Sequence, residues 1–192
     1  MNDGSKQIRT FIALEFSQEA RDELVRVEGL LKEADANVKW VDPAIVHLTL
    51  KFLGNVAEDK IDSISGRLDE IASRTSPFDL SLDGIGVFPK WDYVKVLWVG
   101  IAGGSDQVKK LAESVDAAMS EEGFKTEERD FSPHITIGRV RTAKRKEKLR
   151  EIASNVRVEP VTSHITGIVL FKSELSPKGA IHTPLSVLDF RG

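Results

Sequence analysis

The sequence predicts a fold of strands and helices in which two related lobes form one domain over residues 1–192. Two observations indicate this fold. Short β-prone apolar runs alternate with segments whose apolar residues recur at helical spacing. A four-residue pattern, His-x-Thr-x, also occurs twice, as HLTL at 47–50 and as HITI at 134–137.

The two copies of the pattern lie in similar surroundings. Each ends a succession of strand, helix and strand, and the lengths match: 36 positions separate Phe11 from His47, and 37 separate Leu97 from His134. Outside the motifs the residues do not visibly repeat. The matched spacing favours a duplication, so we expect each lobe to supply one motif strand to a shared cleft.

The individual elements are predicted in chain order from apolar periodicity and turn residues. FIALEF at 11–16 is typical of a buried strand, and the apolar residues of 20–31 then recur as in an amphipathic helix. IVHLTLKFLG at 45–54 is β-rich and closes on Gly-Asn, before a second helical stripe in 61–71. PKWD separates two apolar runs in 78–102, which predicts two strands joined by a turn.

The second half of the chain continues this alternation. A helix is expected over 108–118, a strand over 131–140 and a basic helix over 144–154. Two strands, at roughly 161–171 and 180–190, complete the chain.

The composition is that of an ordinary globular protein. Of 192 residues, 41% are hydrophobic and 30% are charged, and no apolar run approaches the roughly 20 residues that cross a bilayer. MNDGSKQIRT at the start of the sequence lacks the apolar core of a signal peptide, so we expect a cytoplasmic protein. The absence of cysteine excludes disulfides, thiolate metal sites and a cysteine nucleophile.

Basic residues are concentrated after the second motif. The net charge of −3 gives no general attraction to nucleic acid, yet the stretch from Arg139 to Arg150 contains seven basic residues and a single acidic one, Glu147. Such a run usually forms a solvated helix face, which is the interpretation we favour. Its position beside the motif permits an alternative, a rim that attracts phosphate groups.

The repeated motif places a histidine and a threonine on one face of a strand. Because side chains alternate across a strand, His47 shares a face with Thr49, and His134 with Thr136. The intervening apolar residues point the other way. An imidazole titrates near neutral pH and a hydroxyl both donates and accepts hydrogen bonds. Packing of the core gives no reason for the same histidine and threonine pair to occur on two strands. The repetition therefore indicates that the pair has a function.

Three chemistries could use two histidines. A zinc site needs three or four ligands, and neither strand has a further imidazole or carboxylate at ligand spacing. A serine nucleophile needs an elbow such as Gly-x-Ser-x-Gly, which the sequence lacks. General acid–base catalysis remains, with one imidazole accepting a proton and the other donating one. This mechanism suits a phosphodiester, because the attacking and leaving oxygens lie on opposite sides of phosphorus and each histidine can serve one of them. The threonine hydroxyls would then contact the non-bridging oxygens.

An ordered set of motifs resembles the 2H phosphoesterases, and within them the RNA 2′,3′-cyclic phosphodiesterases, also called 2′-5′ RNA ligases. The set spans nearly the whole chain and comprises FIALEF, HLTLKFLG, VLWVGI, SPHITIGRV and LFKSELSPKGAIHTPL. The resemblance implies a two-lobed α+β fold with two related antiparallel sheets, helices on the outside and a central cleft. It also implies hydrolysis of 2′,3′-cyclic phosphate ends of RNA to 2′-phosphates. The scheme with two histidines requires no metal, and we expect no cofactor.

The resemblance assigns roles to individual residues. It implies that His47 protonates the departing 3′ oxygen, that His134 activates water, and that Thr49 and Thr136 contact the phosphate. Arg139 matches a basic position that holds the substrate.

The face on which Arg139 lies depends on the shape of its strand. Strict alternation would place it opposite His134 and Thr136, and a bend at Gly138 would bring it back to their face.

Other aromatic and histidine residues are given structural interpretations. For Phe11 and Phe52 we favour core packing over stacking on a base. His182 lies in the tail, where members of the family often have an aromatic or basic residue. We interpret His182 and His164 as structural or exposed histidines.

The main hypothesis is therefore a phosphodiesterase for RNA ends, with tRNA halves among its candidate substrates. We expect a monomer that does not bind membranes. If the 5′-hydroxyl of a second RNA replaces water, the same site would form a 2′-5′ bond, driven by ring opening. Two alternatives stay open: an enzyme for small cyclic nucleotides or ADP-ribose 1″,2″-cyclic phosphate, and an RNA-binding module without turnover.

Overall fold

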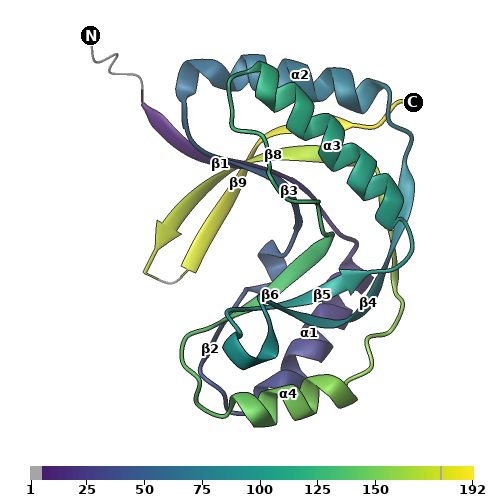
Figure 1. The fold of residues 1–192 in the computed structure, drawn as a ribbon. Helices are drawn as coiled ribbons and strands as arrows, with labels where there is room; N and C mark the ends of the chain where they lie inside the picture. Colours follow the sequence, from purple (N-terminus) through teal and green to yellow (C-terminus); the bar gives the residue numbers. More distant parts are fainter. Residues whose placement is uncertain (1–5, 178) are drawn as a thin grey trace.

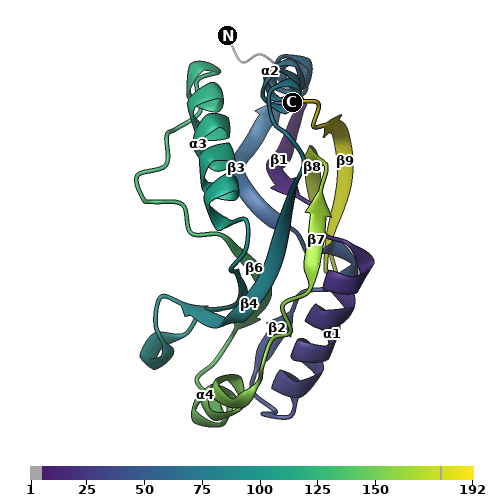
Figure 2. The same cartoon turned by 90° about the vertical axis from the view of Figure 1, so that its right-hand side faces the viewer.

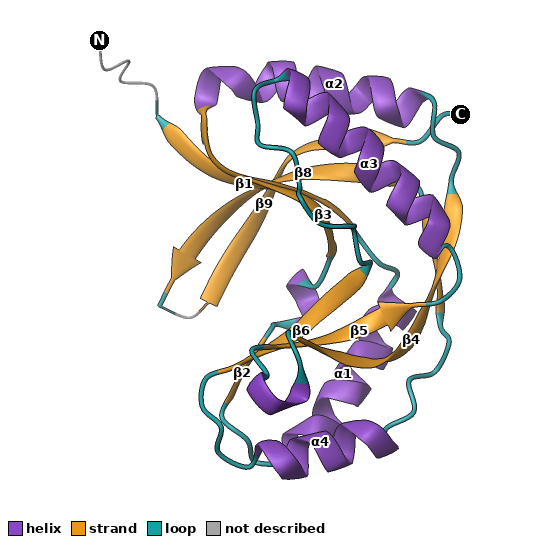
Figure 3. Cartoon of the chain, viewed as in Figure 1, coloured by secondary structure: helices purple, strands orange, loops and turns teal. Residues whose placement is uncertain are grey.

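The computed structural model describes residues 6–177 and 179–192 and contains two sheets with helices packed against them (Figures 1 and 3). The strands are β1 (Gln7–Leu14), β2 (Val38–Trp40), β3 (Leu48–Ala57), β4 (Phe78–Phe88), β5 (Val96–Ile101), β6 (His134–Val140), β7 (Thr162–Ile165), β8 (Gly167–Ser176) and β9 (Gly179–Asp189). The helices are α1 (Gln18–Lys32), α2 (Ile61–Ser73), α3 (Ser105–Glu121) and α4 (Lys146–Asn155), with short 3₁₀ helices η1 (Pro43–Ile45), η2 (Glu58–Lys60) and η3 (Trp91–Tyr93).

Both sheets are antiparallel. Sheet A has the strand order β3-β1-β8-β9, and sheet B has the order β2-β6-β5-β4-β7. In each sheet the motif strand pairs with the strand that begins its own half of the duplication, β3 with β1 and β6 with β5. The two motif strands also contact each other across the sheets. The predicted α+β fold with two related antiparallel sheets is confirmed.

The two halves exchange helices. Helix α1 follows β1 of sheet A but contacts α4 and β7 beside sheet B, whereas α3 follows β5 of sheet B but contacts β3 and α2 beside sheet A (Figures 1 and 2). One hydrophobic cluster accordingly contains buried residues of both sheets, such as Ile12 and Leu50 from sheet A and Leu97 and Ile135 from sheet B. Each sheet therefore depends on the other half for part of its core.

The apolar stripe predicted for the first helix is the buried side of α1. Ala20, Leu24, Val27 and Leu31 are at most 1% exposed, and burial of such aliphatic side chains contributes roughly 1.5–3 kcal/mol for each Val or Leu. Ser17 begins the helix, because its hydroxyl accepts a hydrogen bond from the backbone N–H of Ala20 at 3.3 Å. No helix in the described part of the chain is long and apolar enough to cross a membrane.

Several strand boundaries differ from the prediction. The segment expected as one strand over 161–171 is two strands, β7 in sheet B and β8 in sheet A, because the chain changes sheets at Thr166. Strand β2 was not predicted, since three residues are too few to show alternation. The motif strands also begin later than expected, so that His47 directly precedes β3 and His134 is the first residue of β6.

Candidate active site

Each motif has the two faces that alternation predicts. The apolar residues of the motifs are buried: Leu48, Leu50, Ile135 and Ile137. The polar residues are partly exposed: His47, Thr49, His134 and Thr136. We call the side of each sheet that carries the motif histidine and threonine its motif face. The helices pack on the opposite sides of the sheets, as the buried contact of Lys51 of β3 with Asp116 of α3 illustrates.

Both motif histidines make the same hydrogen bond. Nδ1 of His47 lies 2.9 Å from the carbonyl oxygen of Ile45, and Nδ1 of His134 lies 2.7 Å from that of Ser132. Because a carbonyl oxygen only accepts, each Nδ1 carries the proton and donates it. Nε2 is then unprotonated in the neutral ring and a donor in the protonated ring. Each ring therefore has its second nitrogen, Nε2, available to take or give a proton.

Local chain geometry produces both anchoring bonds. The carbonyl that holds His47 ends η1, which Asp42 caps by accepting from the backbone N–H of Ala44 at 3.0 Å. Arg21 of α1 donates to the carbonyl of Ala44 at 2.8 Å and so ties this turn to the helix. In the second motif, Pro133 restricts the backbone between the anchoring carbonyl and the histidine.

His47 lies in an aromatic cluster on the motif face of sheet A. Its ring stacks on Phe11 with centroids 4.6 Å apart, and the ring of His182 approaches edge-on at 5.2 Å. Phe171 stacks on the same phenylalanine at 5.2 Å. Phe11 and Phe171 are 2% and 6% exposed, so the histidine rests on an apolar floor.

This setting disfavours the protonated form of His47. Burial is the main cause that lowers its pKa from 6.5 to about 4, and the nearby charges of His182 and Arg21 lower it further, while the hydrogen bond to Ile45 opposes them. Burial also lowers the pKa of His182, as does the nearby Arg9. His47 is therefore a neutral imidazole at pH 7 in the free protein.

His134 lies beside different aromatic residues on the motif face of sheet B. Phe88 meets its ring edge-on at 4.9 Å, and Trp98 does so at 6.2 Å. Trp98 pairs directly with Thr136 on one side and with Gly86 on the other. The indole lies across this glycine, since a Cβ at Gly86 would overlap the ring. The absence of a side chain there lets Trp98 form a flat floor next to the second motif.

A β-bulge in β6 brings Arg139 to the motif face. Thr136 pairs with Trp98 of β5, and the next pair along the strands joins Gly138 to Leu97. Ile137 therefore has no opposite residue in β5, and the alternation of side chains shifts by one position. Gly138 then points to the same side as Ile137, where a Cβ would meet the side chains of Val38 and Trp40. Arg139, the next residue, lies on the side of the motif histidine and is exposed. Strict alternation is thus the wrong description, and the distortion lies at Ile137, directly before the glycine at which a bend was expected.

The same bulge occurs at the same place in β3. Thr49 and Lys51 pair with successive residues of β1, so Leu50 between them has no opposite residue. Because of this shift, Phe52 lies on the motif face. Phe52 and Arg139 therefore occupy equivalent positions, each five residues after a motif histidine. The core role expected for Phe52 is wrong, because its side chain is 58% exposed, whereas Phe11 is buried as predicted.

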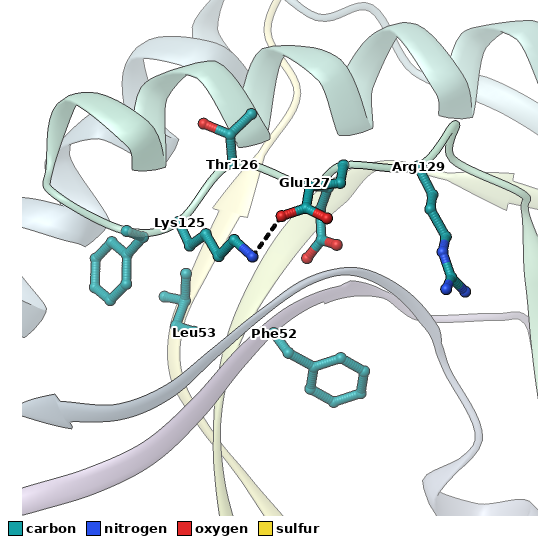
Figure 4. Close-up of a pocket in the computed structure, with 8 residues that line it drawn as sticks. Phe52, Leu53, Lys125, Thr126, Glu127 and Arg129 are labelled. Atoms are coloured by element: carbon teal, nitrogen blue, oxygen red, sulfur yellow. Dashed lines mark ion pairs between the residues drawn. The ribbon is translucent and has the colours of Figure 1, made fainter.

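Two hollows lie near the motifs. One of about 370 Å³ is bounded by Phe52 and by the loop that follows α3, including Arg129 (Figure 4). A second, of about 460 Å³, is bounded by Trp98, Ser132 and Pro133 among others. Neither His47 nor His134 is among the residues that line these two hollows. Among the described residues, no group of three His, Cys, Asp or Glu is arranged to hold a metal ion.

The paired motifs and the two-sheet fold agree with a comparison against known families. The sequence profile of the 2′-5′ RNA ligase superfamily matches residues 16–177, which include both motifs. The chain belongs to the 2′-5′ RNA ligase superfamily. The resemblance to the 2H phosphoesterases, inferred from the motifs, is thereby confirmed.

Two curated relatives match over nearly their whole length. An RNA 2′,3′-cyclic phosphodiesterase of Methanothermobacter thermautotrophicus is 36% identical over 182 residues, covering 94% of this chain and 98% of the relative. A protein of the same name from Aquifex aeolicus is 33% identical, covering 93% and 95%.

Two solved structures share the fold. TT0787 of Thermus thermophilus superimposes with a TM-score of 0.80 at 28% identity, covering 96% of this chain and 99% of the other. E. coli LigT complexed with 3′-AMP has a TM-score of 0.77 at 24% identity, covering 97% and 100%.

Some neighbours of the motif histidines were not foreseen. Phe171 gave no signal beyond its apolar strand, and His182 was interpreted as structural or exposed. The structure places His182 beside His47, and its Nδ1 is buried without a hydrogen-bond partner in the part of the chain that the structure describes. His164, by contrast, is exposed and bonded through Nδ1 to a carboxylate oxygen of Asp79 at 2.7 Å, as expected for a surface histidine.

Proposed function

We propose that this protein hydrolyses RNA ends that carry a 2′,3′-cyclic phosphate and releases a 2′-phosphate. The observation that supports this most is the identical anchoring of the two motif histidines, which leaves one Nε2 in each half for proton transfer. Membership of the superfamily supports it too, as does the name RNA 2′,3′-cyclic phosphodiesterase carried by the relatives.

The reaction needs one proton taken and one proton given. In our scheme Nε2 of His134 takes a proton from water as the water oxygen bonds to phosphorus. The bond from phosphorus to the 3′ oxygen breaks, and Nε2 of His47 gives that oxygen its proton. Thr49 and Thr136 donate hydrogen bonds to the non-bridging oxygens, and Arg139 adds positive charge on the same face.

The low pKa of His47 is compatible with its role as the acid if the substrate supplies the missing charge. In the free protein burial keeps this ring neutral. A phosphodiester anion beside the ring would raise the pKa of His47, since an opposite charge within about 4–6 Å typically does so by about 1–3 pH units. Binding of the substrate would thus favour the protonated form of His47, which is the form that donates the proton.

The same arrangement would permit 2′-5′ ligation of two RNA strands. If the 5′-hydroxyl of a second RNA takes the place of water, the product contains a 2′-5′ phosphodiester, and opening of the strained ring drives its formation without ATP. No separate nucleotide-binding step is needed in this scheme.

The experiment is a turnover assay with an RNA oligonucleotide that ends in a 2′,3′-cyclic phosphate, in the presence of EDTA. We expect a 2′-phosphate product, and losses of roughly 10²- to 10⁴-fold in kcat for His47→Gln and for His134→Gln. A 3′-phosphate product, or inactivity in EDTA, would refute the scheme. Binding without any product would favour the RNA-binding module, and faster turnover of ADP-ribose 1″,2″-cyclic phosphate would favour the small-nucleotide enzyme.

A modified substrate separates the two histidine roles. When sulfur replaces the 3′ oxygen, the leaving group departs without a proton. The His47→Gln variant should then recover most of its activity, while His134→Gln should stay inactive because water still has to lose its proton. Recovery of the His134 variant instead would reverse the assignment.

A further inference from the structure

The edge of sheet B carries a second basic residue on the motif face, outside the reaction centre. Lys39 of β2 lies directly opposite Arg139 of β6. Residues that are directly opposite in an antiparallel pair share a face, with Cβ atoms about 4.5–5.5 Å apart. Lys39 therefore lies next to Arg139 on the same side as the motif histidine of this sheet.

The neighbours of Lys39 confirm the side to which it points. Val38 and Trp40, which flank it in β2, pack against the hydrophobic core and surround Gly138. Alternation then directs Lys39 away from the core. Its side chain is exposed, as is that of Arg139.

The pair has no acidic partner among the described residues, unlike Arg145 and Lys146 at the start of α4. Arg145 pairs with Asp35 at 2.7 Å, and Lys146 lies 3.7 Å from a carboxylate oxygen of Glu147. Within residues 6–177 and 179–192, neither Lys39 nor Arg139 forms an ion pair. Lys39 and Arg139 are therefore two exposed basic residues, opposite each other at the edge of sheet B, that have no carboxylate partner in the described part of the chain.

We propose that Lys39 and Arg139 bind the phosphodiester that precedes the cyclic phosphate, so that the site prefers an RNA strand to a nucleotide. Like charges directly opposite each other are unfavourable in a sheet, and a bound anion removes the repulsion. The proposal rests on the proposed function, because that function places the cyclic phosphate at the motif residues.

The spacing along the sheet separates the two phosphates. Arg139 lies three residues beyond Thr136 on the same face, which at about 3.3 Å per residue is at most about 10 Å. Lys39 is one strand farther away, by about 4.8 Å. Arg139 lies between the position of the cyclic phosphate and that of the preceding phosphodiester. Its guanidinium can bind a phosphate with two parallel hydrogen bonds. Lys39 is the residue that belongs to the second phosphate alone.

The test compares substrates that differ in the number of phosphates. We would measure kcat/KM for a nucleoside 2′,3′-cyclic phosphate and for an RNA oligonucleotide with the same end, over a series of salt concentrations. For Lys39→Gln the loss with RNA should exceed the loss with the nucleotide by roughly tenfold, as for one charged hydrogen bond. The slope of log kcat/KM against log salt should also become shallower by about 0.7 with RNA.

The matched control is Lys110→Gln, which removes the same charge at an exposed position of α3. This variant should keep the wild-type ratio between the two substrates. Equal losses with RNA and nucleotide in the Lys39 variant, or an unchanged salt slope, would overturn the proposal.

Binding of a fluorescent RNA, followed by anisotropy at several salt concentrations, tests the surface without turnover. If the wild type hydrolyses neither substrate, the proposed function fails. In that case a shallower salt slope of RNA binding in Lys39→Gln would still support the phosphate site, and an identical slope would refute it.

Discussion

Acidification should destabilise this protein through His47. The folded state lowers the pKa of this residue from 6.5 to about 4, chiefly by burial. Between these two pH values the unfolded chain binds a proton at residue 47 and the folded protein does not. The free energy of unfolding therefore falls as the pH falls from 6.5 toward 4. At about 1.36 kcal/mol per pH unit, this single residue accounts for a loss of about 3 kcal/mol.

The variant His47→Gln isolates this contribution. Glutamine does not titrate, and its amide can still donate to the carbonyl of Ile45. From pH 7.5 to pH 4 the variant should lose about 3 kcal/mol less stability than the wild type, as measured by urea denaturation at half-unit pH steps. The control Gln107→Ala changes an exposed residue of α3 that does not titrate and should keep the wild-type decline.

Parallel stability curves for wild type and His47→Gln would refute the reasoning, since they would mean that the imidazole titrates alike in the folded and unfolded states. Enzyme kinetics give a second measurement of the same group. One limb of the pH profile of kcat/KM reports the free protein and should lie near pH 4.

Two further predictions concern the residues behind the motif face. Asp116→Ala should lower the free energy of unfolding by about 3 kcal/mol, because the buried ammonium of Lys51 then keeps only the carbonyl of Lys125 and the exposed carboxylate of Glu127 at 4.0 Å. Lys51→Met should cost less than about 1 kcal/mol, because it removes the buried charge itself. Urea titration at pH 7 distinguishes the two, and equal losses would contradict the argument. Gly138→Val should force the side chains of Val38 and Trp40 aside and cost about 1–3 kcal/mol. It should also lower kcat/KM for RNA ends by moving Arg139, so an unchanged kcat/KM would show that the bulge does not position this arginine.

Local patterns were sufficient for the motif residues. The His-x-Thr-x pattern places its own polar and apolar side chains on opposite faces, because alternation needs only the strand itself. The burial of Leu48 and Ile135 and the partial exposure of His47 and His134 follow from it. The stripe of α1 was predictable for the same reason, since helical periodicity selects its buried side.

Features that depend on pairing between distant segments were not predictable in this way. Phe52 and Arg139 reach the motif faces through bulges, and a bulge is a property of two paired strands. His182 comes beside His47 because β8 and β9 complete sheet A next to β1. Lys39 lies on a strand too short to show alternation, and its position is known only from its pairing with β6.

By itself the sequence determined the residues of the candidate site: the imidazoles of His47 and His134, the hydroxyls of Thr49 and Thr136, and the strands that carry them. Only the tertiary structure decided how these groups behave. Burial on Phe11 sets the protonation of His47, and the register of β6 sets the direction of Arg139. The physical reason is that residue types and periodicities are local, whereas desolvation and strand register arise from contacts between segments far apart in the chain.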